Sequence, residues 1–227
     1  KRNNEVDPKF MHQHFANQTN LKQWGKLVNE ECLCGQRQTL NHVLKWCALS
    51  LEQGRFTFRH DNILYYISKC LDKKRYKCFL DLEGQHTEAG GTIPSSLLVT
   101  TKKPDIVIVD QKSKSVNIFE LTVPGESRID TAHNLKMESY SHFTTDIRTH
   151  TVTVTPFEVG AHTGHINQDN KKRLHTLHTF CTKDVKLKRF KENISALSIL
   201  SSYYIFNSRN QETWSTPDHI LAPFSNQ

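Results

Sequence analysis

The sequence predicts an α/β domain, with a mixed sheet flanked by helices, that follows a small zinc-binding module. Three observations predict it. Four Cys and His residues lie within residues 32–47, two β-rich apolar stretches follow each other near the centre, and segments of helical spacing precede and follow them. The 227 residues, 36% of them hydrophobic, suffice for one substantial core and a small satellite module.

Residues 1–29 are polar, with scattered apolar side chains, and we expect them to be irregular. A helix is expected to begin at Arg59-His60-Asp61, with Asp61 as its N-cap, and its apolar stripe continues to about Cys78. The glycines and the proline of residues 81–96 predict a loop.

The centre of the chain predicts two strands joined by a tight turn. Asp105–Val109 is almost wholly apolar, as in a strand that is buried on both faces, and Val116–Val123 follows after the polar residues 111–115. Asp110 is expected to begin the turn between them. The Pro124-Gly125 pair then ends the second strand.

The second half of the chain continues the α/β order. It predicts a helix over residues 127–148, a strand over Thr151–Val159, a loop over residues 160–164 and one or two helices over residues 167–207. We therefore assign residues 55–207 to the α/β domain and residues 208–227 to an irregular tail.

The Cys/His cluster has the spacing C-x-C-x7-H-x4-C, formed by Cys32, Cys34, His42 and Cys47. Zinc prefers four thiolate or imidazole ligands in a tetrahedron, and the H-x4-C half fits one helical turn. Gly35 permits the tight backbone that such a knuckle needs. We assign residues 30–50 to this knuckle, because buried cysteines and a surface histidine rarely bring four such donors together.

The other cysteines, Cys70, Cys78 and Cys181, are expected to be small core residues rather than ligands. The chain starts with Lys1 rather than Met, which favours a piece of a longer protein. No apolar run approaches the roughly 20 residues of a membrane span, and no secretory leader is recognisable.

The net charge of +7, from 30 Lys and Arg against 23 Asp and Glu, favours a polyanionic partner. The alternative is that the charge serves solubility alone, and charge by itself does not decide between the two. Three basic runs, residues 73–75, 171–173 and 186–191, contribute to this charge. Each run alone is typical of a solvated face, so only their sum indicates nucleic acid.

Two acidic residues of the central hairpin form a candidate catalytic pair. Asp105 begins the first strand and Glu120 lies within the second, with fourteen residues between them, so a tight hairpin brings their carboxylates together. Paired buried carboxylates repel each other unless a divalent cation lies between them. Such a cation activates water and stabilises a phosphate undergoing hydrolysis.

A lysine two residues after the second acid would complete this kind of site, but Thr122 occupies that position. Lys136 of the following predicted helix, with Ala132 and Tyr140 on the same helix face, could reach back over the sheet instead. The alternative roles are a strand cap for Asp105, an exposed salt bridge for Glu120 and a solvated Lys136. An acid inside an apolar strand favours the functional interpretation, because a buried carboxylate without a partner costs several kcal/mol.

Taken together, these motifs resemble the restriction-like endonuclease region of early-branching, site-specific non-LTR retrotransposons, over roughly residues 30–165. The residues that carry the resemblance are the C-x-C-x7-H-x4-C cluster, Arg59-His60-Asp61, Lys103-Pro104-Asp105, Phe119-Glu120-Leu121-Thr122-Val123-Pro124 and Ala132-x3-Lys136-x3-Tyr140.

The resemblance implies a zinc knuckle before a PD-(D/E)xK restriction-endonuclease-like core. In that family the catalytic lysine is thought to have moved from the strand to the next helix. Asp105 and Glu120 would then bind Mg²⁺ or Mn²⁺, Lys136 would be the catalytic lysine and Tyr140 a supporting residue. Arg59, His60 and Lys103 are expected to contact DNA.

The resemblance also implies a biological setting. Nucleases of this family nick target DNA in the nucleus, and the new 3′ hydroxyl primes reverse transcription by an upstream polymerase domain. The expected partners are target DNA and that polymerase domain, and the element's RNA is a further candidate. Two alternatives stay open: an inactive or domesticated nucleic-acid-binding module, and a cellular repair or junction-resolving nuclease with the same core.

Overall fold

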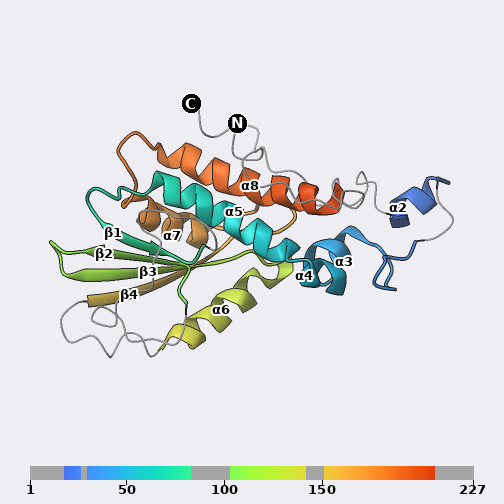
Figure 1. Ribbon diagram of the computed structural model, residues 1–227, viewed down its shortest axis with the longest axis horizontal. Coiled ribbons are helices and arrows are strands. Elements are labelled where there is room, and N and C mark those ends of the chain that lie inside the picture. Colours follow the sequence, from blue (N-terminus) through green and yellow to red (C-terminus); the bar gives the residue numbers. More distant parts are fainter. Residues whose placement is uncertain (1–17, 27–29, 83–102, 142–150, 208–227) are drawn as a thin grey trace.

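The computed structural model describes residues 18–26, 30–82, 103–141 and 151–207. Within them, a mixed α/β arrangement places one sheet between helices, and a group of short helices lies at one end (Figure 1). The elements are α2 (Gln18–Gln23), α3 (Leu40–Lys45), α4 (Ala48–Glu52), α5 (Arg55–Cys70), β1 (Lys77–Leu80), β2 (Ile106–Asp110), β3 (Ser115–Thr122), η1 (Glu126–Arg128), α6 (Ile129–Tyr140), β4 (Thr151–Glu158), α7 (Gln168–His178) and α8 (Leu187–Asn207).

The sheet has four strands in the order β1-β2-β3-β4. β1 and β2 pair antiparallel, as do β2 and β3, whereas β3 and β4 pair parallel. The parallel pair requires a crossover, and α6 lies in that connection. This confirms the mixed sheet flanked by helices that the sequence predicts.

The two faces of the sheet carry different cores. Alternate residues of β2 and β3, such as Ile106, Ile108 and Phe119, pack with α5, α7 and α8 in the larger core. Val107 and Ile118 point to the opposite face, where Tyr140 of α6 joins them. Figure 1 shows α6 on one side of the sheet and α5, α7 and α8 on the other.

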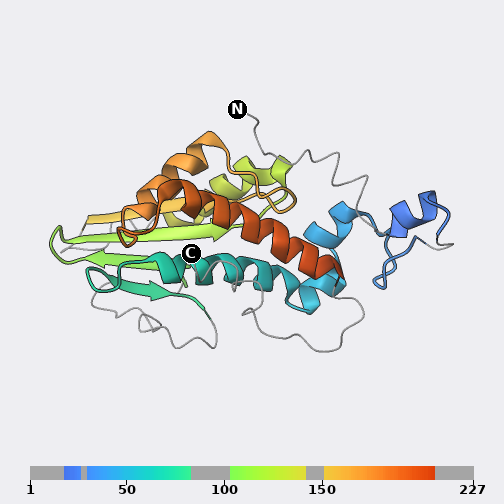
Figure 2. The same ribbon diagram turned by 90° about the horizontal axis from the view of Figure 1, so that it is seen from above.

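α5 and α8 lie side by side and run antiparallel, as both views show (Figure 2). Their contact is partly polar. The side-chain amide nitrogen of Asn62 donates to Ser201 Oγ at 3.1 Å, and that of Asn193 donates to the Tyr66 hydroxyl at 3.0 Å. These bonds fix the register of the two longest helices over the sheet.

Three of the four strands agree closely with the sequence prediction. β2, β3 and β4 each begin or end within a residue of the expected strand. Asp110 ends β2, and its Oδ1 accepts a hydrogen bond from Lys112 N at 2.9 Å, so it begins the turn as expected. The region 167–207 forms two helices, α7 and α8.

The prediction for α5 is wrong at both ends. The helix begins at Arg55, after Gly54 in the left-handed conformation at φ 66°, so Asp61 lies inside the helix and is not its N-cap. It ends at Cys70, and Cys78 belongs to the unpredicted strand β1 instead of to the helical stripe. The apolar run of residues 78–80 suits a short buried strand as well as a helix.

Other predictions fall partly outside the described residues. The segment 1–29 was expected to be irregular, yet it contains the short helix α2. Most of the predicted loop 81–96, the end of the predicted helix 127–148 and the tail 208–227 lie outside the described residues. Among the described residues, no helix is long and apolar enough to cross a lipid bilayer.

Candidate functional site

Asp105 and Glu120 meet where β2 begins and β3 ends. The register pairs Ile106 with Phe119, which places Asp105 opposite Glu120 across the hairpin. Asp105 N donates to Glu120 Oε1 at 3.1 Å, and Leu121 N donates to Asp105 Oδ2 at 2.7 Å. The alternation of side chains places both carboxylates on the α6 face of the sheet.

The pair is buried, and its charge is only partly compensated. Glu120 has no exposed surface and Asp105 is 7% exposed. Burial and the neighbouring charge of Asp105 raise the pKa of Glu120, while Lys136 and Tyr140 act in the opposite direction. Two buried carboxylates close together attract a cation, because burial and mutual repulsion both disfavour their negative charges and a cation offsets them.

Lys136 supplies one positive charge to the pair. Its Nζ lies 2.7 Å from Glu120 Oε2, and its side chain is 33% exposed. Burial lowers the pKa of Lys136, but its hydrogen bond to Glu120 and the negative charges of the neighbouring carboxylates together raise the pKa, which favours the ammonium form. The structure thus places the lysine of α6 beside the acid of β3, as the sequence predicts.

His60 reaches the other carboxylate from α5. Its Nε2 lies 3.4 Å from Asp105 Oδ2, and its Nδ1 lies 3.0 Å from Asp61 Oδ1. Burial lowers the pKa of His60, but the hydrogen bonds to Asp105 and Asp61 raise it to about 9. At neutral pH the ring is therefore an imidazolium that donates to both carboxylates.

Two further residues of the predicted constellation lie at this site. Tyr140 is 5% exposed and hydrogen-bonds Glu120, and Lys136 Nζ lies 6.0 Å from the centre of its ring. Thr122 Oγ1 is buried and has no hydrogen-bond partner among the described residues. Ala132, one turn before Lys136 in α6, lines a neighbouring pocket.

A second acidic group, which the sequence prediction missed, lies on the adjacent strand. Glu158 ends β4 opposite Thr122 and has no exposed surface. His133 Nδ1 lies 3.2 Å from its Oε1, and Arg173 Nη1 lies 3.2 Å from its Oε2. The available signal was an acid next to a phenylalanine in a predicted strand, since Glu158 follows Phe157 as Glu120 follows Phe119.

The Cys/His cluster is brought together as predicted and could hold a metal such as zinc. The ligand atoms of Cys32, Cys34, His42 and Cys47 all lie within 4.8 Å of one another. Cys47 Sγ lies 3.7 Å from Cys32 Sγ and 3.9 Å from Cys34 Sγ. Tetrahedral zinc with Zn–S bonds of about 2.3 Å implies sulfur separations of about 3.8 Å, so the donor set fits.

The local backbone explains how the knuckle forms. A bridge between Glu31 and Arg37 closes the turn that carries the first two cysteines, and Gly35 adopts the left-handed φ of 83° that this turn needs. His42 lies on α3. That helix ends at Lys45, so Cys47 lies beyond it at the N-cap of α4, and the expected single helical turn between His42 and Cys47 is wrong.

The expected DNA-contacting residues occupy three different environments. Lys103 is exposed just before the acidic pair, whereas His60 contacts that pair directly. Arg59 is only 4% exposed; its Nη1 donates to Leu44 O at 3.2 Å and its Nη2 donates to Val123 O at 3.2 Å. Arg59 therefore joins the knuckle to the end of β3.

The basic runs differ in how much of their charge is already paired. Lys172 and Lys188 form exposed ion pairs with acids of their own helices, at 3.1 Å and 3.8 Å, and Arg173 is paired with Glu158.

Comparison with known proteins does not identify a family, because no protein-family model and no curated protein matches this chain.

Proposed function

We propose that this protein is a metal-dependent DNA endonuclease with a PD-(D/E)xK core. The observation that carries the proposal is the contact of three groups from separate elements: Asp105 before β2, Glu120 in β3 and Lys136 in α6. A carboxylate pair beside an ammonium group is a constellation that can support metal-assisted phosphodiester hydrolysis.

The metal site would consist of Asp105 and Glu120. Mg²⁺ and Mn²⁺ prefer oxygen ligands, and Mg²⁺ usually keeps several waters beside one or two carboxylates, so two carboxylates suffice. Burial and, after it, repulsion by Asp105 raise the pKa of Glu120, and a bound cation would relieve that repulsion. When bound, the cation supplies water activation and charge stabilisation at the scissile phosphate.

The protein side chains would then have distinct roles. The Lys136 ammonium contacts Glu120 Oε2 from a partly exposed side chain, so it can stabilise negative charge that develops on a phosphate. Tyr140 holds the Glu120 carboxylate by a hydrogen bond, and His60 holds Asp105. Tyr140 and His60 are positioning residues, because they act through the carboxylates.

The net charge of +7 supports a nucleic-acid substrate. The resemblance to non-LTR retrotransposon nucleases adds a specific setting: nicking of target DNA in the nucleus, to prime reverse transcription by an upstream polymerase domain. In this setting the zinc knuckle would contribute to DNA binding beside the catalytic core.

The decisive experiment is nicking of supercoiled plasmid with added Mg²⁺ or Mn²⁺ and with neither. We expect metal-dependent conversion to the open circle, and loss of that conversion in Asp105→Asn and Glu120→Gln. The exposed Glu138→Gln variant serves as the matched acid control and should cleave at the parental rate. Metal-independent cleavage, or full activity of Glu120→Gln, would exclude the proposed site.

The same assay separates the two alternatives when it is combined with a DNA-binding measurement and with a four-way junction as a second substrate. A parent protein that binds DNA but does not nick it with either metal would be a binding module. Preferential cleavage of a four-way junction over the plasmid would favour a junction-resolving nuclease.

A further inference from the structure

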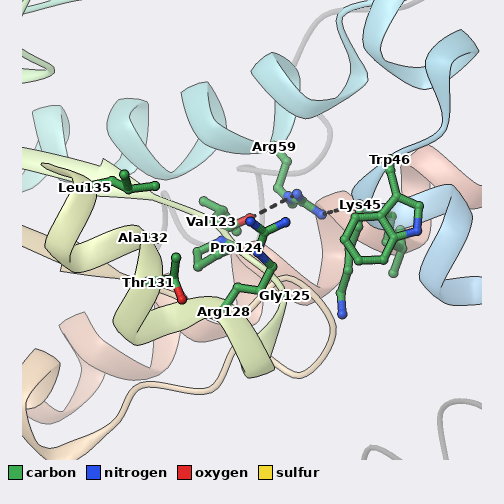
Figure 3. Close-up of a pocket in the computed structure, with 11 residues that line it drawn as sticks. Lys45, Trp46, Arg59, Val123, Pro124, Gly125, Arg128, Thr131, Ala132 and Leu135 are labelled. Carbon is green, nitrogen blue, oxygen red and sulfur yellow. Dashed lines mark hydrogen bonds between the residues drawn. The ribbon is translucent and has the colours of Figure 1, made fainter.

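A pocket of about 200 Å³ lies where the knuckle meets the end of β3 and the start of α6. Figure 3 shows Arg59, Arg128, Lys45 and Trp46 around this space, from α5, η1 and the end of α3. Pockets for drug-sized ligands are larger, about 300–1,000 Å³, so this one suits a small group such as a phosphate.

The charge of the pocket is positive. Three cationic side chains line it, and none of the described residues that line it is acidic. The charge of the Glu126 carboxylate acts on Arg59 and Lys45, but this carboxylate is already engaged: its Oε1 accepts hydrogen bonds from His162 N and Thr163 N, each at 2.9 Å.

Arg59 is a buried cation of the pocket whose hydrogen bonds within the described residues are all to uncharged oxygen atoms. It is 4% exposed, its partners are two carbonyl oxygens and a hydroxyl oxygen, and its Nε has no hydrogen-bond partner among the described residues. Burial lowers its pKa to about 10, so it still carries its charge at neutral pH. Buried charges in proteins are normally paired, and an incoming anion would pair this one.

Trp46 adds an exposed aromatic ring to the rim of the pocket. Its side chain is exposed (52%), and Lys45 Nζ lies 5.5 Å from its ring centre. Because Trp46 directly precedes the zinc-ligating candidate Cys47, the knuckle fixes its place. Aromatic rings beside cationic grooves are typical of sites where unpaired bases stack.

The pocket adjoins the acidic pair through two elements. Arg59 lines the pocket while its neighbour His60 contacts Asp105, and Val123 follows the strand that carries Glu120. We propose that the pocket binds a backbone phosphate of the DNA strand at the acidic site, while an unpaired base of that strand stacks on Trp46. This inference rests on the proposed function, which supplies the DNA strand at that site.

Fluorescence anisotropy with labelled DNA, in buffer without added divalent metal, tests the proposal independently of cleavage. The probes are a hairpin-capped duplex and the same duplex with a short single-stranded gap. The variants are Arg128→Gln and Trp46→Ala, both at exposed positions, with Trp46→Phe to retain a ring. Lys112→Gln, at the opposite end of β3, is the matched charge control.

We expect Arg128→Gln to lower the slope of log K against log salt by about one unit, as for one lost phosphate contact. Trp46→Ala should weaken binding of the gapped duplex about tenfold and leave the capped duplex unchanged, whereas Trp46→Phe should retain most of the affinity. Lys112→Gln should match the parent.

The proposal is overturned if both pocket variants bind the gapped DNA as Lys112→Gln does. Zinc content, measured for each variant, shows whether the knuckle is intact. If the parent never nicks plasmid but the pocket variants lose affinity in this pattern, the proposed nuclease is refuted and the proposed pocket is supported. If the parent nicks plasmid and the pocket variants bind as the parent does, the proposed nuclease is supported and the proposed pocket is refuted.

Discussion

At the scale of single residues, the position of the positive charge is the unusual feature of the acidic site. Thr122, two residues after Glu120, has a buried hydroxyl with no partner among the described residues and no charge to offer. The charge comes from α6, where Lys136 Nζ lies 2.7 Å from Glu120 Oε2. A lysine on a helix can approach the same point as a lysine on the strand, because side-chain length makes up for the greater backbone distance.

Lys136→Ala should therefore lower the cleavage rate by about two orders of magnitude, because a preorganised charge at a developing anion typically contributes a few kcal/mol. DNA affinity, measured without divalent metal, should change little. Thr122→Lys in the Lys136→Ala background should recover part of the activity, since it restores the charge on the face of Glu120. Cleavage by Lys136→Ala at the parental rate would mean that Lys136 only neutralises Glu120.

At the scale of elements, the central hairpin and β4 could be predicted because each strand is a short apolar run between polar turns. α5 was harder, since its first turns carry Arg55 and Arg59, which look exposed in a sequence but are 8% and 4% exposed in the fold. Arg59 is held inside by tertiary contacts to the carbonyl groups of Leu44 and Val123, which no periodicity reveals.

At the candidate site, too, local features could be predicted and features that depend on tertiary contacts could not. Asp105 and Glu120 belong to one hairpin, so counting residues across it predicts that they meet. Glu158 reaches the site through the parallel β3–β4 pair, and the long connection through α6 leaves its register unconstrained by local spacing. The displaced Lys136 was predicted because the helical interval to Tyr140 placed both on one face.

Glu126 links two elements by hydrogen bonds, and its contribution to the free energy of unfolding should depend on pH. Its Oε1 accepts three hydrogen bonds from His162 and Thr163, which join η1 to the loop after β4. Burial raises the pKa of Glu126, but the backbone hydrogen bond from Thr163 and the charge of His162 outweigh this, so the pKa lies below its ordinary value of 4.5. The charged form is therefore the stabilising one, present above pH 4.5 and lost as the pH falls through the lowered pKa.

Glu126→Gln should lower the free energy of unfolding by about 1.5–3 kcal/mol at neutral pH, the usual range for hydrogen bonds to a charged group. Urea denaturation at several pH values should show this difference shrinking below about pH 4.5, where the parent loses the same charge. Glu138→Gln, at an exposed position, should be nearly neutral throughout. A difference that stays constant down to pH 3 would assign the effect to packing.

At the scale of the whole molecule, the knuckle and the α/β domain have separate cores. Leu40, Val43 and Leu44 pack with Phe58 in a small cluster, whereas the large core lies between the sheet and α5, α7 and α8. Three side chains are too few to hold the knuckle by hydrophobic burial alone, since each contributes roughly 1.5–3 kcal/mol before the entropy of ordering is subtracted. Metal binding would supply the rest.

The protein should accordingly contain one zinc ion per chain, on Cys32, Cys34, His42 and Cys47, and its removal should unfold the knuckle alone. Structural zinc contributes on the order of 10 kcal/mol to such a module, whereas the large core contains no candidate ligand of this cluster. Metal analysis should give one zinc for the parent and for Cys181→Ala, whose half-buried thiol lies outside the cluster, but none for Cys47→Ser. In hydrogen exchange after chelation, the amides of α3 and α4 should lose protection while those of β2, β3 and the second half of α5 keep it. Absence of zinc after gentle purification would refute the assignment, and loss of protection across the sheet would show that the two cores unfold together.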